Sequence, residues 1–269
     1  MSKSIIKLLS NIFPETFTNI AYNKLANPQL IKLRDHERVV LDKAKQQDIT
    51  FKHFQIRTYE WANAGEPVLL IHGWEGQAGN FSDLIDKLLE KGLRVYAFDA
   101  PAHGYSSKGE TNPLEFAQLV GHLLKELKVK RCISHSFGGV AVTYALFQNQ
   151  TLSLEQLVLV TTPDRFSERI SDVANRVGVS VKVQQRLLQR LAAMKVDVSA
   201  LNVSDFVKQI NVSKALILHD INDKVLPFEQ SRNVHLHWPQ SRLVEVEGTG
   251  HFRILRTESV LDQIVEFIL

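Results

Sequence analysis

The fold is decided by one stretch, Arg131-Cys132-Ile133-Ser134-His135-Ser136-Phe137-Gly138-Gly139, in which a short apolar run gives way to a serine among small residues. Ser134 and Gly138 stand two positions before and after Ser136. Small residues at this spacing predict a sharp turn from a strand into a helix, with the serine side chain exposed at the sheet edge. A serine hydroxyl is a poor nucleophile near neutral pH. It becomes useful only if an imidazole takes its proton and N–H donors hold the developing oxyanion.

Composition limits the kind of protein this chain can be. Its 269 residues suit one large α/β domain or a domain with an insertion. The 32 basic and 29 acidic residues are interspersed and leave a formal charge of +3, which argues against a nucleic-acid partner. No run approaches the roughly 18 apolar residues of a membrane span. The single cysteine, Cys132, is expected to be a buried structural thiol, and the absence of a disulfide favours the cytoplasm as location.

Residues 1–48 predict an N-terminal helical segment packed on the core of the protein. Pro14 and Pro28 punctuate runs whose apolar residues recur at helical spacing. The run from Ile5 to Phe13 is accompanied by only two lysines, which favours packing on the protein over a helix lying on a membrane surface. No chemistry is expected from this segment. Residues 49–61 alternate between apolar and polar types and predict a β-hairpin.

After Gly65, short apolar runs alternate with longer amphipathic segments. The expected strands are 68–71, 95–98, 132–133, 157–160, 215–218 and 243–246, and the expected helices are 79–91, 112–127, 137–149, 227–236 and 257–269. This alternation predicts a parallel sheet covered on both faces, with a ligand site beyond the carboxyl ends of the strands. Residues 163–211 carry helical patterns and no strand. We expect them to lie over the site as a lid, rather than to form a crossover helix far from it.

A second strand end offers donors for an oxyanion. The turn His72-Gly73-Trp74-Glu75-Gly76 follows the first long apolar run, and its two glycines allow backbone N–H groups to point inward. The N–H groups of Trp74 and of Phe137, the residue after the serine, are the expected oxyanion hole. His72 is expected to orient this turn through a hydrogen bond rather than to act as a base.

Two further strand ends offer an acid and a base. Asp220 and Asp223 follow the strand at 215–218, and both are candidates for the acid. His251 lies in a glycine-rich turn after the last strand, which is the flexible setting that an imidazole needs to reach the serine. The chain order of serine, acid and histidine is that of the nucleophile-elbow hydrolases. No cluster of histidine, cysteine and acidic residues has the spacing of metal ligands.

Together these pieces resemble an α/β-hydrolase-fold serine hydrolase of the esterase and lipase kind. The matching motifs are His72-Gly73-Trp74, Asp99–Ser106, Ser134–Gly139, Asp220–Asp223 and Gly250-His251-Phe252. The resemblance implies a mostly parallel eight-stranded sheet flanked by helices, formed by residues 49–162 and 212–269, with a helical cap at 163–211 after the sixth strand. It also implies that Ser136 is the nucleophile, His251 the base and Asp223 the acid.

The sequence departs from the family pattern at two positions, and one rival acid stays open. Ser134 and Ala102 stand where the family usually has glycine. Asp164 follows the sixth expected strand, where some relatives place their acid. His103 lies in a turn whose residues are mostly structural in the family, so no catalytic role is expected of it.

The expected function is cleavage of a carboxylic ester or related acyl bond through an acyl-enzyme on Ser136. A small or medium acyl substrate is expected from the apolar residues of the lid, and neither a cofactor nor a metal is required. The alternatives are an acyltransferase or thioesterase with the same triad, and a non-catalytic ligand-binding protein on the same fold. The sequence carries no information on the oligomeric state.

Overall fold

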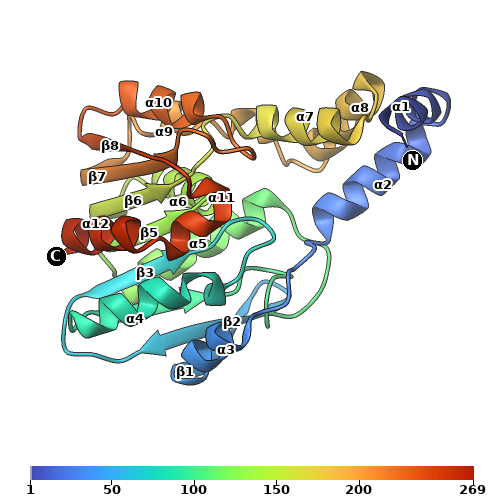
Figure 1. Ribbon diagram of the computed structural model, residues 1–269. Coiled ribbons are helices and arrows are strands. Elements are labelled where there is room, and N and C mark those ends of the chain that lie inside the picture. Colours follow the sequence, from blue (N-terminus) through green and yellow to red (C-terminus); the bar gives the residue numbers. More distant parts are fainter. Residues whose placement is uncertain (1) are drawn as a thin grey trace.

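The computed structural model describes residues 2–269, and a single eight-stranded sheet organises them (Figure 1). The strands are β1 (Lys45–Phe51), β2 (Phe54–Trp61), β3 (Pro67–Ile71), β4 (Arg94–Phe98), β5 (Arg131–His135), β6 (Ser153–Val160), β7 (Asn211–Asp220) and β8 (Ser241–Val246). Their order across the sheet is β1-β2-β4-β3-β5-β6-β7-β8. The pairs β1–β2 and β2–β4 are antiparallel and the remaining pairs are parallel. The predicted mostly parallel eight-stranded sheet is therefore confirmed.

Strand β5 lies in the middle of the sheet, between β3 and β6. Its residues Cys132, Ile133 and Ser134 are fully buried because helices cover both faces of the sheet. A strand buried on both sides reads as a continuous apolar run, which is why it could be recognised from the sequence. Cys132 is a free buried thiol, as expected, and burial raises its pKa.

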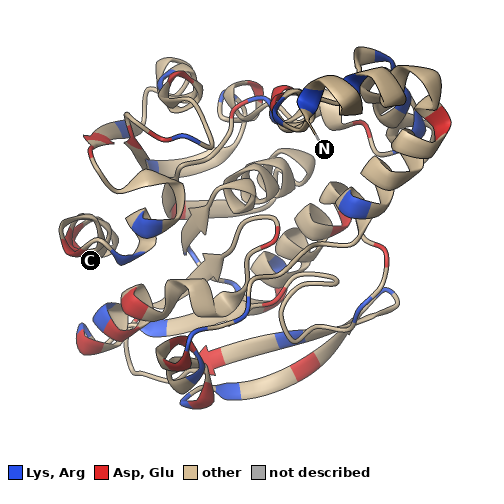
Figure 2. Cartoon of the chain, turned by 45° about the vertical axis from the view of Figure 1, so that its right-hand side comes forward, with Lys and Arg blue, Asp and Glu red and all other residues tan. Residues whose placement is uncertain are grey.

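Helices cover the sheet in two layers (Figure 1). One layer consists of α3 (Asp35–Asp42), α4 (Ser82–Glu90) and α12 (Glu258–Ile268), and the other consists of α5 (Pro113–Leu127), α6 (Phe137–Gln148) and α10 (Phe228–Leu236). Short 3-10 helices occupy Ala78–Phe81, Val198–Ala200 and Ile254–Arg256. Figure 2 shows charged residues of both signs spread over the outer helices and strands. Within residues 2–269, every helix is too short or too polar to span a membrane.

Three helices are inserted between β6 and β7, as the sequence predicts for a cap. They are α7 (Phe166–Val177), α8 (Val181–Ala193) and α9 (Val203–Phe206). The two ends of the insertion are fastened together where it leaves the sheet. Arg165 forms an isolated β-bridge with Asn202, and the Phe166 N–H donates to the Leu201 carbonyl at 3.1 Å. The insertion therefore enters and leaves the core at one place.

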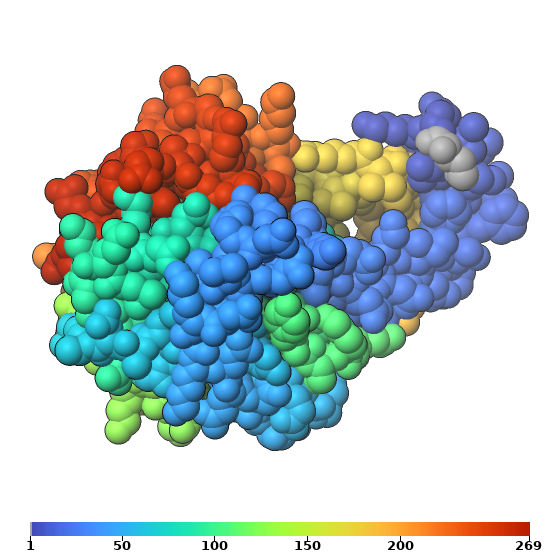
Figure 3. All heavy atoms as spheres, turned by 60° about the horizontal axis from the view of Figure 1, so that its bottom comes forward, coloured from blue at the N-terminus to red at the C-terminus, as the bar shows by residue number. Residues whose placement is uncertain are grey.

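The N-terminal helices divide between the core and the cap. Helix α3 contacts α4, whereas α1 (Lys3–Ile12) and α2 (Pro14–Ala26) contact α8. The Ser180 N–H at the start of α8 donates to Ser10 Oγ at 2.9 Å, and Arg186 pairs with Glu15 at 2.6 Å. Figure 3 shows the first N-terminal residues, in dark blue, beside the yellow cap helices, and the blue chain continuing from there onto the body of the protein. From the sequence we expected all of residues 1–48 to pack on the core. The contacts of α1 and α2 with the cap could not be predicted, because no local pattern in these residues identifies α8 as their partner.

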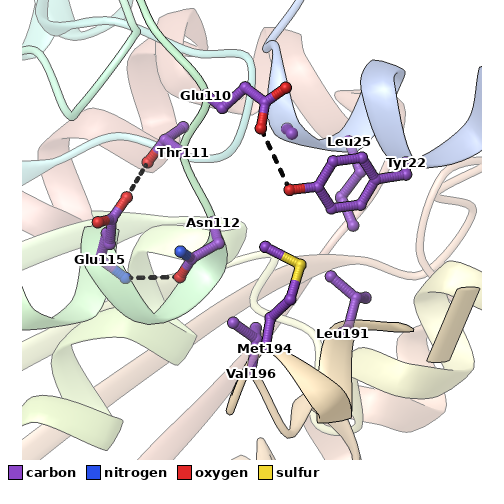
Figure 4. A pocket seen from close by; sticks show the side chains of 10 residues that line it. Tyr22, Leu25, Glu110, Thr111, Asn112, Glu115, Leu191, Met194 and Val196 are labelled. Carbon is purple, nitrogen blue, oxygen red and sulfur yellow. Dashed lines mark hydrogen bonds between the residues drawn. The ribbon is translucent and has the colours of Figure 1, made fainter. Parts of the chain in front are cut away.

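The C-terminal end of α2 contacts the core of the protein (Figure 4). The Tyr22 hydroxyl donates to Glu110 at 3.3 Å, and the Arg190 guanidinium lies 3.8 Å from the centre of the Tyr22 ring. Burial and the Glu110 carboxylate raise the pKa of Tyr22. A cavity of about 140 Å³ lies beside this contact, between α2, the segment before α5 and the end of α8. Tyr22 thus joins the N-terminal helices, the cap and the core at one site.

Close packing beneath the serine turn predicts the effect of one substitution. In Gly138→Ala the new Cβ would lie 2.3 Å from the Ile71 carbonyl oxygen and 2.7 Å from that of His72. Because both neighbours are backbone atoms, we expect the free energy of unfolding in urea to fall by about 1–3 kcal/mol. Gly121→Ala is the matched control, since its Cβ meets only the Ala145 Cβ at 3.5 Å. It should leave stability unchanged or raise it by up to about 1 kcal/mol, and equal losses in the two variants would contradict the packing account.

Candidate active site

Ser136 lies in the turn between β5 and α6, with a backbone φ of 51° and ψ of −123°. Residues other than glycine rarely adopt a positive φ, and such strain costs on the order of 1–3 kcal/mol. Two backbone hydrogen bonds hold the turn: the Ser136 N–H donates to the Val160 carbonyl at 2.9 Å, and the Gly139 N–H donates to the Ser136 carbonyl at 3.0 Å. The expected sharp turn from strand to helix is therefore present.

The small residues around Ser136 each meet a steric requirement. A Cβ on Gly73 would lie 3.0 Å from the Ser136 Cβ, so this glycine lets the neighbouring loop approach the serine. Ser134, in the position where glycine is usual, is fully buried, and its hydroxyl donates to the Val158 carbonyl at 2.9 Å. The departure at Ser134 is thus accommodated, because the buried hydroxyl has a partner.

His251 lies between the serine and an aspartate. It belongs to α11 (Gly250–Arg253), and its Nε2 is 3.1 Å from Ser136 Oγ. Its Nδ1 is 2.7 Å from Asp223 Oδ2. With Nδ1–H donating to the carboxylate, Nε2 is left to accept the serine proton. We call this chain of two hydrogen bonds the Ser136–His251–Asp223 array.

Asp223 is held as a carboxylate by several donors. Its Oδ1 accepts hydrogen bonds from the N–H groups of Val225 at 2.6 Å and Leu226 at 3.1 Å. Behind it lies His219, whose Nε2 is 3.5 Å from Oδ2. Burial alone would raise the pKa of Asp223, but the nearby His219 and the hydrogen bonds from His251 and the Val225 N–H outweigh it and lower the pKa. The carboxylate therefore stays ionised and can stabilise an imidazolium.

The other two candidate acids have structural positions. Asp220 accepts hydrogen bonds from the Thr249 hydroxyl at 2.9 Å and the Gly250 N–H at 2.6 Å, so it shapes the turn that carries His251. The carboxylate of Asp164 accepts hydrogen bonds from the Ser204 N–H at 2.7 Å and from the Asn233 side-chain amide. It therefore links the start of the cap to α9 and α10.

The expected oxyanion donors belong to the loop after β3 and to the first residue of α6. Within residues 2–269, neither the Trp74 N–H nor the Phe137 N–H donates a hydrogen bond. The Gly73 carbonyl accepts from His72 Nδ1 at 2.7 Å and from the Gly76 N–H at 2.9 Å. Because this carbonyl and the Trp74 N–H belong to one planar trans peptide, the two bonds also fix the direction of the N–H. His72 thus has the orienting position that the sequence suggested.

Two other histidines support the site. His103, as expected, lies in a structural turn, where its Nε2 accepts from the Glu75 N–H at 3.1 Å. His135 is buried beside the serine, and its Nε2–H donates to the His251 carbonyl at 2.8 Å. Burial, followed by the nearby His251, lowers the pKa of His135 to about 3. The position of His135 in the site could not be predicted from the sequence, because its partner lies 116 residues further along the chain.

A cavity of about 990 Å³ opens onto the serine and His251. Helix α7 contributes one face to it, with residues Phe166, Arg169, Ile170, Val173, Ala174 and Val177. Helix α2 contributes another, with Phe17, Ile20, Ala21, Lys24 and Leu25. Both sets follow the helical spacing of three and four residues. The N-terminal segment, to which the sequence assigned no chemistry, is therefore part of the cavity wall.

The hydrogen bonds of the Ser136–His251–Asp223 array determine the chemistry that this arrangement can perform. A serine hydroxyl beside an imidazole that can accept its proton supports proton transfer and nucleophilic attack. Within residues 2–269, no group of three or more histidine, cysteine, aspartate and glutamate side chains is placed to hold a metal ion.

Comparisons with known proteins point to one fold. A family model for the alpha/beta hydrolase fold matches residues 66–193. The structure of Est1E from Butyrivibrio proteoclasticus with ferulic acid bound is 18% identical, with a TM-score of 0.65, over 82% of this chain and 99% of that one. At this identity the likeness establishes the fold.

Two curated relatives are ester hydrolases by name. The sn-1-specific diacylglycerol lipase ABHD11 of Xenopus tropicalis is 26% identical over 175 residues, covering 61% of this chain and 52% of the relative. The pimeloyl acyl-carrier protein methyl ester esterase of Stenotrophomonas maltophilia strain K279a is 30% identical over 103 residues, covering 38% of each. The chain spans about half the length of the curated Xenopus lipases that it matches.

The buried neutral His135 predicts a pH dependence of stability. The unfolded chain takes up a proton on this histidine as the pH falls through about 6.5, whereas the folded protein does so only near pH 3. The stabilisation that comes from the neutral, buried His135 is therefore fully present above the unfolded-state pKa, and the free energy of unfolding falls as the pH drops below that pKa. His135→Gln keeps an N–H donor but does not titrate. Between about pH 7 and about pH 5, wild type should lose about 2 kcal/mol more unfolding free energy than the variant, and parallel curves would contradict the assignment.

Proposed function

The chain has the α/β-hydrolase fold, and we propose that it is a serine hydrolase that cleaves a carboxylic ester or a related acyl bond through an acyl-enzyme on Ser136. The resemblance seen in the sequence is confirmed at the level of the fold. One observation carries the proposal: the Ser136–His251–Asp223 array connects a strained, half-buried serine that lines the cavity to a buried carboxylate through one imidazole.

Attack on the substrate is the first step of the proposed reaction. As Ser136 Oγ bonds to the acyl carbon, its proton passes to His251 Nε2, 3.1 Å away. The electron pair of the carbonyl moves onto its oxygen, and the free N–H groups of Trp74 and Phe137 would stabilise that oxyanion. The ionised Asp223 stabilises the imidazolium through its 2.7 Å hydrogen bond to Nδ1.

Release of the two products completes the reaction. The tetrahedral intermediate collapses, the bond to the leaving group breaks, and His251 gives its proton to the departing alcohol. A water molecule then attacks the acyl-enzyme while His251 takes one of its protons, and the second collapse frees the carboxylic acid and restores Ser136. A thiol in place of the alcohol makes the chain a thioesterase, and an alcohol in place of water makes it an acyltransferase.

The cavity favours a larger acyl group than the sequence suggested. Its volume of about 990 Å³ is at the upper end of ordinary ligand pockets, and apolar faces of α2 and α7 line it. We therefore propose an ester with a substantial apolar portion as the small-molecule substrate, at or above the upper end of the small or medium acyl group expected from the sequence. The intact array disfavours the alternative of a non-catalytic ligand-binding protein, and the cytoplasmic location stays a prediction.

The proposed nucleophile is tested with a fluorophosphonate probe and a p-nitrophenyl ester. The wild-type chain should be labelled and should hydrolyse the ester, whereas Ser136→Ala should lose labelling and several orders of magnitude in kcat. Ser134→Ala is the matched control, because it removes a hydroxyl two positions away that bonds only to the Val158 carbonyl. It should keep both activities. Persistent labelling of Ser136→Ala would point to another nucleophile.

The proposed acid is tested by amide substitution. Asp223→Asn should lower kcat by about 10⁴-fold, because the amide favours the wrong tautomer of His251. Asp164→Asn keeps an oxygen acceptor for the Ser204 N–H and should change kcat by less than about tenfold. A larger loss for Asp164→Asn than for Asp223→Asn would move the acid role to Asp164.

A further inference from the structure

Helix α7 presents one charged residue among apolar ones to the cavity. The apolar members of this face are Phe166, Ile170, Val173, Ala174 and Val177. Arg169 stands among them, one turn after Phe166 and one turn before Val173. Phe166 packs into the core, whereas Val173 and Val177 are 42% and 49% exposed, so the later part of this face is open to the cavity. A guanidinium in such a stripe needs a physical explanation.

Arg169 differs from the other arginines of the cap in having no partner. Within residues 2–269, its guanidinium makes neither a hydrogen bond nor an ion pair, and its Nη1 is buried. By contrast, Arg165 lies 3.9 Å from Glu168, Arg176 donates to the Val225 carbonyl at 3.2 Å, and Arg186 pairs with Glu15 at 2.6 Å. An arginine cannot give up its charge, so burial without a partner is costly.

The charges around the cavity indicate which kind of partner is missing. Burial and the nearby Arg176 lower the pKa of Arg169, and Asp172, Asp223 and Glu75 oppose that effect. Asp223 already belongs to the Ser136–His251–Asp223 array. The cationic residues that line the cavity are Lys24, Lys32, Arg34, Arg169 and Arg256, against the acidic Glu37 and Glu75. A surplus of positive charge around an apolar cavity attracts an anion.

We infer that Arg169 binds a carboxylate or phosphate group of the substrate whose acyl bond Ser136 attacks. The guanidinium fork matches both oxyanions, since two parallel N–H groups can meet two oxygens. The substrate class is thus an ester with an apolar chain for the α2 and α7 faces and an anionic group for Arg169. This inference rests on the proposed hydrolase function, and it adds a residue that determines specificity.

Two p-nitrophenyl esters of equal chain length test the inference. One is the ester of a monocarboxylic acid, and the other is the monoester of the corresponding dicarboxylic acid, whose far end is an anion. A third ester with a terminal phosphate distinguishes the two oxyanions. Wild type should prefer the anionic esters in kcat/KM. Arg169→Met keeps the length and apolar character of the stripe, and it should lower kcat/KM for the anionic esters by about 10–100-fold, the effect of one charge-assisted contact.

Three controls separate a binding role from a structural one. With Arg169→Met, kcat/KM for the neutral ester should change less than about twofold and the melting temperature should stay equal or rise, because an unpaired charge is removed. Arg169→Lys should restore part of the preference for anions. Arg176→Met, on the same helix but bonded to Val225, should leave the preference unchanged. Equal loss on neutral and anionic esters, or no preference in wild type, would overturn the inference.

A binding measurement keeps the inference separate from the proposed reaction. Calorimetry on Ser136→Ala with an alkyl phosphate and with the alcohol of equal chain length needs no turnover. The phosphate should bind at least about tenfold more tightly than the alcohol, and adding Arg169→Met should remove the difference. If the difference is present but no ester is cleaved, the anion site stands and the hydrolase proposal fails. If esters are cleaved but phosphate and alcohol bind equally, the anion site is wrong and the hydrolase proposal stands.

Discussion

The arrangement of this protein depends on a backbone constraint at Ser136. A non-glycine residue is held at φ 51°, and this places its side chain above the carboxyl edge of the sheet. Neighbours that contribute almost no volume make the turn possible: Gly138 lies against the carbonyl of Ile71, and Gly73 lies against the serine itself. The strain is local, and the surrounding parallel strands hold it through ordinary backbone hydrogen bonds.

Asp220, the last residue of β7, and Asp223, in the loop that follows, position His251 in different ways. Asp220 binds the backbone of the turn that carries the imidazole, whereas Asp223 binds the imidazole directly. His135, next to the serine in sequence, holds the same turn from the other side through the carbonyl of His251. The distance between the serine and the histidine is thus set by contacts to the backbone of the histidine turn as well as by its side chain.

Much of the fold and of the candidate site could be predicted from local pattern and chain order. Buried parallel strands such as β5 are continuous apolar runs, and Ser136, Asp223 and His251 each follow an expected strand. What could not be predicted depends on contacts between distant segments. The packing of α2 on α8 and the missing partner of Arg169 leave no local signal. The contribution of the N-terminal helices to the cavity wall could not be predicted for the same reason.

Trapping of the acyl-enzyme would show directly whether Ser136 is the nucleophile. The intact wild-type chain is mixed with an activated ester of a long-chain acid, quenched in acid and examined by mass spectrometry, followed by mapping of the modified peptide. The account predicts that the chain gains the mass of one acyl group, and that the group is on the peptide that contains Ser136. An acyl group on another residue, or turnover of the ester with no trapped intermediate on this serine, would contradict it.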